Sequence, residues 1–297
     1  MYKTNVQEIY KLPTDKKERE RLSVQHQIWN ILFGGLNAPA LHETINSRMA
    51  VRDGPPPAVL DVGCGSASWA IEMASVYLQA QILGVDLAID PSLHYAAPNV
   101  QFKQLDITHG FPPTPGGYTI IHARVVTGHL KDPTAFVQAA FAELKPGGLL
   151  ILADVFKPIW ADKSIPVPLF PGVHDPENLP PGGSWWAGWI DFWHRACYVD
   201  YRTTESLINA HDGLSVVHQE RYLVPMHPSN DTEEREGLGA VSNSITLGFC
   251  HAGIKPFVAT GQFTRTQVEE WIRLIQREFE TKPIYMAWDI ACGVKSS

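Results

Sequence analysis

This sequence of 297 residues predicts an α/β fold in which a doubly wound sheet has mostly parallel strands. Five short apolar segments are typical of buried parallel strands: residues 58–63, 81–88, 100–107, 118–124 and 149–156. Helices are expected over 67–79 and 133–148, with Lys145 in the last turn of the second and Pro146–Gly148 ending it. Because strands alternate with connections of helix length, an open parallel sheet is expected.

The segments on either side of this core predict the domain organisation. Residues 1–55 are expected to form an N-terminal helical cap, and the stiff run Gly54–Pro57 separates it from a domain of residues 56–297. An insertion of about residues 157–211 follows the fifth strand. The remaining elements are expected in this order: helices over 17–33 and 38–50, a loop over 157–184, a helix over 184–211, a strand over 214–226, helices over 232–250 and 264–280, and a strand over 284–295.

Charge and cysteine content narrow the class of protein. The chain has 24 basic and 31 acidic residues, a net charge of −7, whereas nucleic-acid-binding surfaces are basic, so nucleic acid is not an expected partner. The four cysteines are far apart without zinc-ligand spacing, which favours reduced thiols in the cytoplasm or nucleus and no metal. No apolar stretch is long enough for a membrane span, and the polar N-terminus has no signal core.

The stretch VLDVGCGSASW, residues 59–69, carries the most specific chemical signal. Gly63 and Gly65 let a ligand approach the backbone, and the helix that follows offers free N–H groups at its positive end. Asp86 ends the next strand, 21 residues after Gly65, which is the spacing of a carboxylate that binds ribose hydroxyls. Asp106 ends the third strand, where it would accept a hydrogen bond from an adenine amino group. The sequence therefore predicts a nucleotide-like ligand.

Two features favour S-adenosylmethionine (SAM) over a dinucleotide. A pyrophosphate-binding turn requires glycine at position 68, where this chain has Ser68, and the small residue Ala67 fits the pattern D-x-G-x-G-x-G instead. Asp61 would repel a pyrophosphate but suits the cationic amino-acid part of SAM. The expected cofactor is SAM, with S-adenosylhomocysteine as its product.

On these motifs the chain resembles the class I SAM-dependent methyltransferases and, more narrowly, the fungal LaeA-like methyltransferases. The resemblance covers nearly the whole chain, including VLDVGCGSASWAIEMA, GVDLA, IHARVVTGHLKD and ELKPGG. It implies a Rossmann-like, seven-stranded sheet. It also implies these cofactor contacts: Asp61, Gly63 and Gly65 at the methionine part, Asp86 and Leu87 at the ribose, Asp106 and Ile107 at the adenine, and the backbone of Ala123 at the amino group.

His129 is the candidate for a general base. It follows the fourth strand on the ligand edge, and a histidine suits the removal of a hydroxyl proton during methyl transfer. In many close members of the family that this chain resembles, a small polar residue stands at the position of His129. Those members usually have glycine at the position of Ala67. The alternative is a histidine that packs against its loop, and an amine or carboxylate acceptor would need no base.

The run SWWAGWIDFWHRACY, residues 184–198, is the candidate for the acceptor pocket. Trp186, Trp189 and Trp193 share one helical face. One interpretation is an aromatic wall for a flat or apolar acceptor; the other is a helix packed onto the core. The pocket hypothesis assigns these residues: Trp185, Trp186, Trp189, Trp193 and His194.

Two functions follow from this sequence. The first is an enzyme that methylates a hydroxyl, carboxylate or amine of a small aromatic or apolar secondary metabolite, with O-methylation favoured. The second is a LaeA-like regulator that binds SAM and acts through protein partners in the nucleus. The enzyme is preferred because the chain has no basic localisation cluster and because its insertion is rich in aromatic residues. The oligomeric state is not predicted.

Overall fold

The computed structural model describes residues 11–50, 54–162, 165–166, 183–197, 202–227 and 237–296. These residues fall into two units. One, here the sheet unit, comprises residues 29–154, 202–221 and 289–297; the other, here the helix unit, comprises the described parts of 1–28, 155–201 and 222–288. The N-terminal cap predicted over residues 1–55 is therefore shared between the two units.

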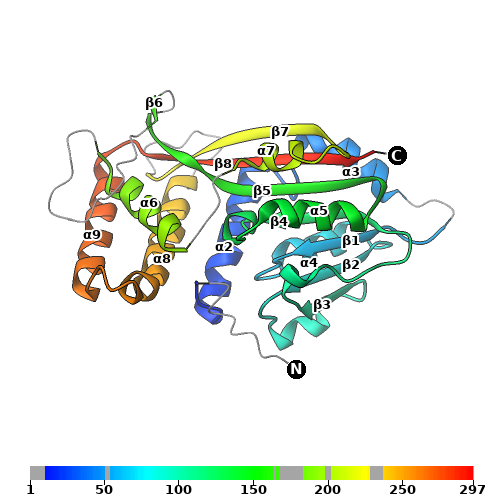
Figure 1. The fold of residues 1–297 in the computed structure, drawn as a ribbon, viewed down its shortest axis with the longest axis horizontal. Helices are drawn as coiled ribbons and strands as arrows, with labels where there is room; N and C mark the ends of the chain where they lie inside the picture. The colour runs from blue at the N-terminus through cyan, green and yellow to red at the C-terminus, as the bar shows by residue number, and fades with distance from the viewer. Residues whose placement is uncertain are drawn as a thin grey trace. The chain divides into compact units, whose positions relative to one another are not determined.

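The strands of the sheet follow the order β3-β2-β1-β4-β5-β8-β7, with β6 paired to β5 off this path (Figure 1). Their bounds are β1 Ala58–Val62, β2 Gln81–Asp86, β3 Val100–Gln104, β4 Tyr118–Arg124, β5 Leu144–Asp162, β6 Ile165–Pro166, β7 Leu214–Pro225 and β8 Tyr285–Lys295. Every pair from β3 through β5 is parallel, and β6 is antiparallel to β5. The strand order reverses between β1 and β4, so the predicted doubly wound, mostly parallel, seven-stranded sheet is confirmed.

The helices begin at recognisable capping residues. Their bounds are α2 Lys16–Phe33, α3 His42–Met49, α4 Ser68–Val76, α5 Pro133–Glu143, α6 Trp185–Cys197, α7 Thr204–Asn209, α8 Leu238–Ala259 and α9 Arg265–Thr281. Asp132 accepts a hydrogen bond from the Ala135 N–H and caps α5. Thr264 and Gln267 form a reciprocal capping box at α9. Short 3₁₀ turns lie at η1 Pro39–Leu41, η2 Pro91–Tyr95, η3 Ile107–His109 and η4 Thr127–His129.

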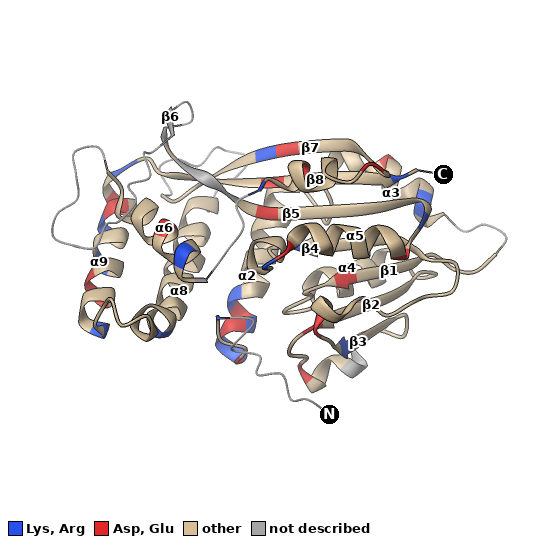
Figure 2. Ribbon diagram, in the orientation of Figure 1, with Lys and Arg blue, Asp and Glu red and all other residues tan. Residues whose placement is uncertain are grey.

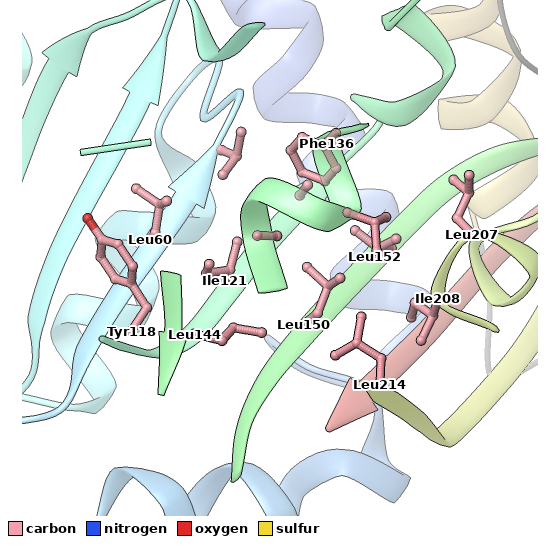
Figure 3. Packing of buried hydrophobic residues seen from close by; sticks show 14 of the residues in the cluster. Leu60, Tyr118, Ile121, Phe136, Leu144, Leu150, Leu152, Leu207, Ile208 and Leu214 are labelled. Carbon is pink, nitrogen blue, oxygen red and sulfur yellow. The ribbon is translucent and has the colours of Figure 1, made fainter. Parts of the chain in front are cut away.

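The core of the sheet unit fills the face of β1, β4 and β5 that α5 covers (Figure 3). Leu60, Ile121 and Leu150 point toward Phe136 of α5, and Leu207 of α7 closes the same cluster. Because successive side chains of a strand point to opposite faces, Asp61 and His122 belong to the other face. On that face the two polar side chains lie among buried apolar ones, which include Val59 and Ile120.

In the helix unit, α6, α8 and α9 pack against one another. Charged residues mark the solvent side of α9 (Figure 2), where Arg265 pairs with Glu269 over 2.8 Å. Its apolar side contributes Trp271, which is 1% exposed. Glu278 is buried and accepts hydrogen bonds from the Ser184 hydroxyl (2.9 Å) and the Trp186 N–H (3.0 Å). A carboxylate of α9 thus satisfies one free N–H group at the start of α6.

Two predicted boundaries near β5 are wrong. The helix predicted over 133–148, with Lys145 in its last turn, stops at Glu143, because Lys145 precedes a proline and is biased toward extended backbone. The loop predicted from residue 157 is wrong for 157–162, which continue β5, and for Ile165–Pro166, which form β6. The antiparallel pairing of β5 with β6 begins at Trp160.

Two helix predictions also need correction. The single helix predicted over 184–211 is instead α6 and α7, because Thr203 starts a new helix by accepting the Ser206 N–H. The helix predicted to end at residue 250 continues to Ala259 as α8 and accommodates Pro256 in its last turns. Burial of Phe257 offsets the hydrogen bond that Pro256 cannot donate. The predicted start of α8 at 232 lies outside the described residues.

Candidate functional site

The turn between β1 and α4 has three left-handed residues at alternate positions. The φ angles are 63° at Gly63, 53° at Gly65 and 64° at Ala67. A Cβ at position 63 would lie 2.5 Å from Cγ2 of Val126, so glycine is required there for packing as well as for φ. Ala67 is the N-cap of α4 and makes no side-chain capping hydrogen bond, which leaves the first N–H groups of α4 to a ligand.

Asp86, at the end of β2, is tied to this glycine turn. Its Oδ2 accepts the Gly65 N–H at 2.8 Å and its Oδ1 accepts the Ala88 N–H at 3.1 Å. Burial raises the pKa of Asp86, an effect that these two backbone donors oppose. Each carboxylate oxygen keeps a lone pair for a further donor. Leu87 follows in the chain and is half-buried.

Asp106 lies just past β3 and caps η3. Its Oδ1 accepts the backbone N–H and the hydroxyl of Thr108, at 3.0 and 2.6 Å. Its Oδ2 is buried without a hydrogen bond, since His109 Nδ1 lies 3.3 Å away outside hydrogen-bonding geometry. An unsatisfied buried oxygen is unfavourable, so this atom is suited to accept a hydrogen bond from a ligand. Ile107 is the next residue and is half-buried.

Asp61, on β1, belongs to a buried polar cluster that sequence reasoning did not recognise. His122 of β4 donates from Nδ1 to Asp61 Oδ1 over 2.8 Å, and its ring stacks on Trp69 with centroids 3.7 Å apart. Arg124 is half-buried nearby. Desolvation lowers its pKa to about 10, and the carboxylates of Asp61 and Glu72 oppose that shift. One sequence signal could have revealed the cluster. Asp61, His122 and Arg124 alternate with apolar neighbours along β1 and β4, a pattern that predicts a shared face of the sheet.

The loop after β4 carries His129 and is held by Asp154 at the end of the parallel part of β5. Asp154 Oδ2 accepts the Thr127 hydroxyl (2.7 Å) and the Gly128 N–H (3.2 Å). His129 ends η4 and is half-buried, and Ala123, at the end of β4, is buried. The predicted cofactor residues and His129 therefore all belong to the sheet unit, on or just after β1, β2, β3 and β4.

Val125 is the other unexpected feature of this loop. Its φ is 56°, a region that a β-branched residue rarely occupies. Its N–H donates to the Ala153 carbonyl over 2.8 Å, so neighbouring strand structure holds it there. Strain of this kind collects at functional sites, where the surrounding structure fixes it.

Replacing Val125 by Asn is expected to stabilise the protein by about 1 kcal/mol, because asparagine tolerates the left-handed region better than valine. Chemical unfolding measures this free energy. The matched control is Val217→Asn on β7, an exposed valine outside the positive-φ set, where the change should destabilise slightly. Equal losses of stability in both variants would show that Val125 stores no strain.

The tryptophans of the predicted acceptor pocket lie in the helix unit. Trp186, Trp189 and Trp193 are 1%, 0% and 2% exposed. Trp189 stacks on Phe257 with ring centroids 4.2 Å apart, and Trp193 packs against Phe249 at 4.9 Å. These contacts agree with the alternative of a core-packed helix. The pocket hypothesis keeps one support, because Nε1 of Trp186 and of Trp189 is buried without a hydrogen-bond acceptor. Trp185 and His194 are half-buried.

Trp189→Ala is expected to lower the free energy of unfolding by about 3–5 kcal/mol, since it opens a cavity among packed rings. Trp189→Phe should cost far less, because phenylalanine keeps the stacking and removes the N–H that has no acceptor. Trp185→Ala is the control, since Trp185 is half-buried and contacts Trp271 through its backbone carbonyl. Urea unfolding followed by circular dichroism measures all three. A Trp189→Ala variant as stable as Trp185→Ala would contradict a core role.

Among the residues that the structure describes, no group of three or more His, Cys, Asp or Glu side chains is arranged to hold a metal ion. Over the same part of the chain, none of the helices combines the length and the apolar character that crossing a membrane requires.

Comparison with known proteins assigns the family. The profile of a family described as "Methyltransferase domain" matches residues 37–219, more than half of the chain. Methyltransferase str3 of Strobilurus tenacellus is 28% identical over 244 residues, which cover 81% of this chain and 78% of that protein. The secondary metabolism regulator laeA of Coprinopsis cinerea is 28% identical over 228 residues, 75% of this chain. The match spans 54% of that regulator, so this chain corresponds to about half of its length.

A solved structure has a similar arrangement of elements. It is a putative sarcosine dimethylglycine methyltransferase from Galdieria sulphuraria, with a TM-score of 0.49 and 16% identity, covering 86% of this chain and 84% of that one. The family profile spans η1 through the first half of β7 and so includes the glycine turn, Asp61, Asp86, Asp106 and His129. The chain belongs to the methyltransferase domain family.

Proposed function

We propose that this protein transfers the methyl group of SAM to a small-molecule acceptor, an aromatic or apolar secondary metabolite, and that it favours a hydroxyl. The observation that carries the proposal is a set of three carboxylates, which are hydrogen-bond acceptors, at one edge of the sheet. Asp61 lies on β1, Asp86 ends β2 and Asp106 lies just past β3. These three strands are adjacent and parallel, and they lie next to a glycine turn in which a Cβ at Gly63 would collide with Val126. Ligands of open α/β sheets bind at this edge.

The residues present fit SAM. The carboxylate of Asp86 would accept hydrogen bonds from both ribose hydroxyls, with Leu87 beside the sugar. The unsatisfied Oδ2 of Asp106 would accept a hydrogen bond from the adenine amino group, and Ile107 would flank the adenine. The open N-terminus of α4 would take the carboxylate of the amino-acid part, with Asp61 and the Ala123 carbonyl near its ammonium group. When bound, SAM supplies an electrophilic methyl group on a sulfonium.

The acceptor would be aligned and deprotonated by this chain. His129 would take the hydroxyl proton as the new bond to the methyl carbon forms and the sulfur–methyl bond breaks. The hydrogen bonds from Thr127 and Gly128 to Asp154 fix the loop that carries His129, which limits the movement of the base. We keep Trp185, Trp186, Trp189, Trp193 and His194 as candidate acceptor-binding residues of the helix unit, and the unsatisfied indole N–H groups of Trp186 and Trp189 support this part of the proposal.

Binding and transfer test the proposal separately. Calorimetry of the full chain with SAM and with S-adenosylhomocysteine should give saturable binding, and [methyl-¹³C]SAM should label at least one member of a panel of phenols, aliphatic alcohols, carboxylic acids and amines. Mass spectrometry detects the mass increase, and boiled protein is the control. Absence of binding to either cofactor form would contradict the proposal at its base. Labelling confined to amines would contradict the preference for oxygen.

A second candidate function is supported by the similarity to the Coprinopsis regulator. In that case SAM would be bound without transfer to any small acceptor, and the protein would act through protein partners. Saturable binding of SAM together with no labelled product across the whole panel would favour this candidate over the enzyme.

A further inference from the structure

We propose that His122 is a positioning residue that fixes the carboxylate of Asp61 for the cationic amino group of the cofactor. This inference rests on the proposed function, since it assigns a role in SAM binding to a residue that does not itself contact SAM. It is carried by the geometry of a cluster in which Asp61, Trp69 and His122 are buried and Arg124 is half-buried.

Strand register brings the first pair together. Asp61 of β1 and His122 of β4 are Cα partners in a parallel ladder, so their side chains leave the sheet on the same face. The Nδ1–H of His122 donates to Asp61 Oδ1 over 2.8 Å, and the two side chains are 5% and 4% exposed. A buried, charge-assisted hydrogen bond of this length fixes the plane of the carboxylate and leaves its Oδ2 for another donor.

Helix α4 fixes the imidazole in turn. Trp69, in the first turn of α4, stacks on His122 with centroids 3.7 Å apart and planes 13° from parallel. Trp69 is itself 3% exposed, so the ring of His122 is confined between a strand and a buried indole. The Nδ1–H of His122 can therefore point in only one direction. Such preorganisation of a binding group favours ligand affinity.

The charges of the cluster match a cationic ligand. Burial lowers the pKa of His122 below 6.5, so the imidazole is neutral at physiological pH and donates to Asp61 without adding charge. Arg124 remains protonated, since burial lowers its pKa only to about 10. The carboxylates of Asp61 and Glu72 act on Arg124, and Glu72 also accepts hydrogen bonds from the Asn30 amide at 3.1 and 3.3 Å. Two carboxylates against one guanidinium leave one negative charge for the ligand to balance.

A pair of ligands separates positioning from general structural support. S-adenosylhomocysteine has the amino-acid part that Asp61 would meet, whereas 5′-methylthioadenosine has the same adenosine and thioether without it. His122→Phe keeps an aromatic ring for Trp69 to stack on and removes the donor. It should raise the Kd of S-adenosylhomocysteine about tenfold or more while the Kd of methylthioadenosine changes less than about twofold. Calorimetry at about pH 8 measures both.

Three further variants sharpen the test. In His122→Asn the amide donates from nearly the position of Nδ1, so it should restore most of the affinity for S-adenosylhomocysteine. Asp61→Asn should lose at least as much affinity as His122→Phe, and the double variant should lose no more than Asp61→Asn alone, since His122 acts only through Asp61. His251→Phe, at an exposed histidine of α8, is the matched control and should bind both ligands like the wild type.

Each outcome is decisive. Three outcomes would overturn the positioning role and leave the proposed function standing. They are equal losses of affinity for the two ligands in His122→Phe, additive losses from Asp61→Asn and His122→Phe, and unchanged affinity in His122→Phe. If the wild type binds neither ligand, the proposed function itself fails. If His122→Phe does not fold, as judged by circular dichroism, the comparison of His122→Asn with Asp61→Asn decides: the role requires retention in the first and loss in the second.

Discussion

Asp86→Ala is expected to raise the Kd for SAM by about 10²- to 10⁴-fold, because two ribose hydroxyls lose a charged acceptor worth about 1.5–3 kcal/mol each. A second effect adds to the first. Asp86 also accepts the Gly65 N–H over 2.8 Å, so the glycine turn loses the contact that holds it against β2. Calorimetry with SAM and S-adenosylhomocysteine measures the loss.

Controls for Asp86 separate charge from shape. Asp86→Asn keeps one acceptor oxygen and should show an intermediate loss, whereas Asp212→Ala, at an exposed acid between α7 and β7, should bind SAM normally. Because burial raises the pKa of Asp86 above the usual 3.8, affinity for SAM should fall on acidification before an ordinary aspartate would be protonated. Wild-type affinity in Asp86→Ala would refute the assignment of the ribose site, and with it the cofactor.

His129→Asn is expected to lower kcat for a hydroxyl acceptor by about 10²- to 10⁴-fold, the contribution typical of a positioned general base. The Kd for S-adenosylhomocysteine should stay near the wild-type value, since His129 would act on the acceptor. Single-turnover transfer from labelled SAM measures the rate of the chemical step without the contribution of product release.

The matched control is His251→Asn, at an exposed histidine of α8, where the same change should leave kcat at the wild-type value. If an amine proves to be the acceptor, its methylation should be insensitive to His129→Asn, because an unprotonated amine has no proton to lose before attack. A hydroxyl acceptor methylated at the wild-type rate by His129→Asn would instead assign proton removal to another group, and His129 would then be a loop residue packed behind Asp154.

The local part of the site was predictable because it depends on residues close together in sequence. A left-handed turn between a strand and a helix is predicted by Gly63, Gly65 and the small Ala67. The three φ values near 60° agree with this prediction. Asp86 and Asp106 were predicted at strand ends because an apolar run that stops at an acid marks where a buried strand reaches solvent. The Thr264–Gln267 capping box was readable for the same reason.

The sheet, its glycine turn and its acidic strand ends were predictable from the amino-acid sequence, since periodicity and turn chemistry are properties of short segments. The partners of the polar groups were not, because they depend on contacts between distant segments. The hydrogen bond between Asp61 and His122 joins residues 61 positions apart, and Glu278 caps α6 from 92 positions away. The tertiary structure also decided that Trp189 packs inside an aromatic core. Such contacts depend on strand register and helix packing, which arise only when distant segments meet.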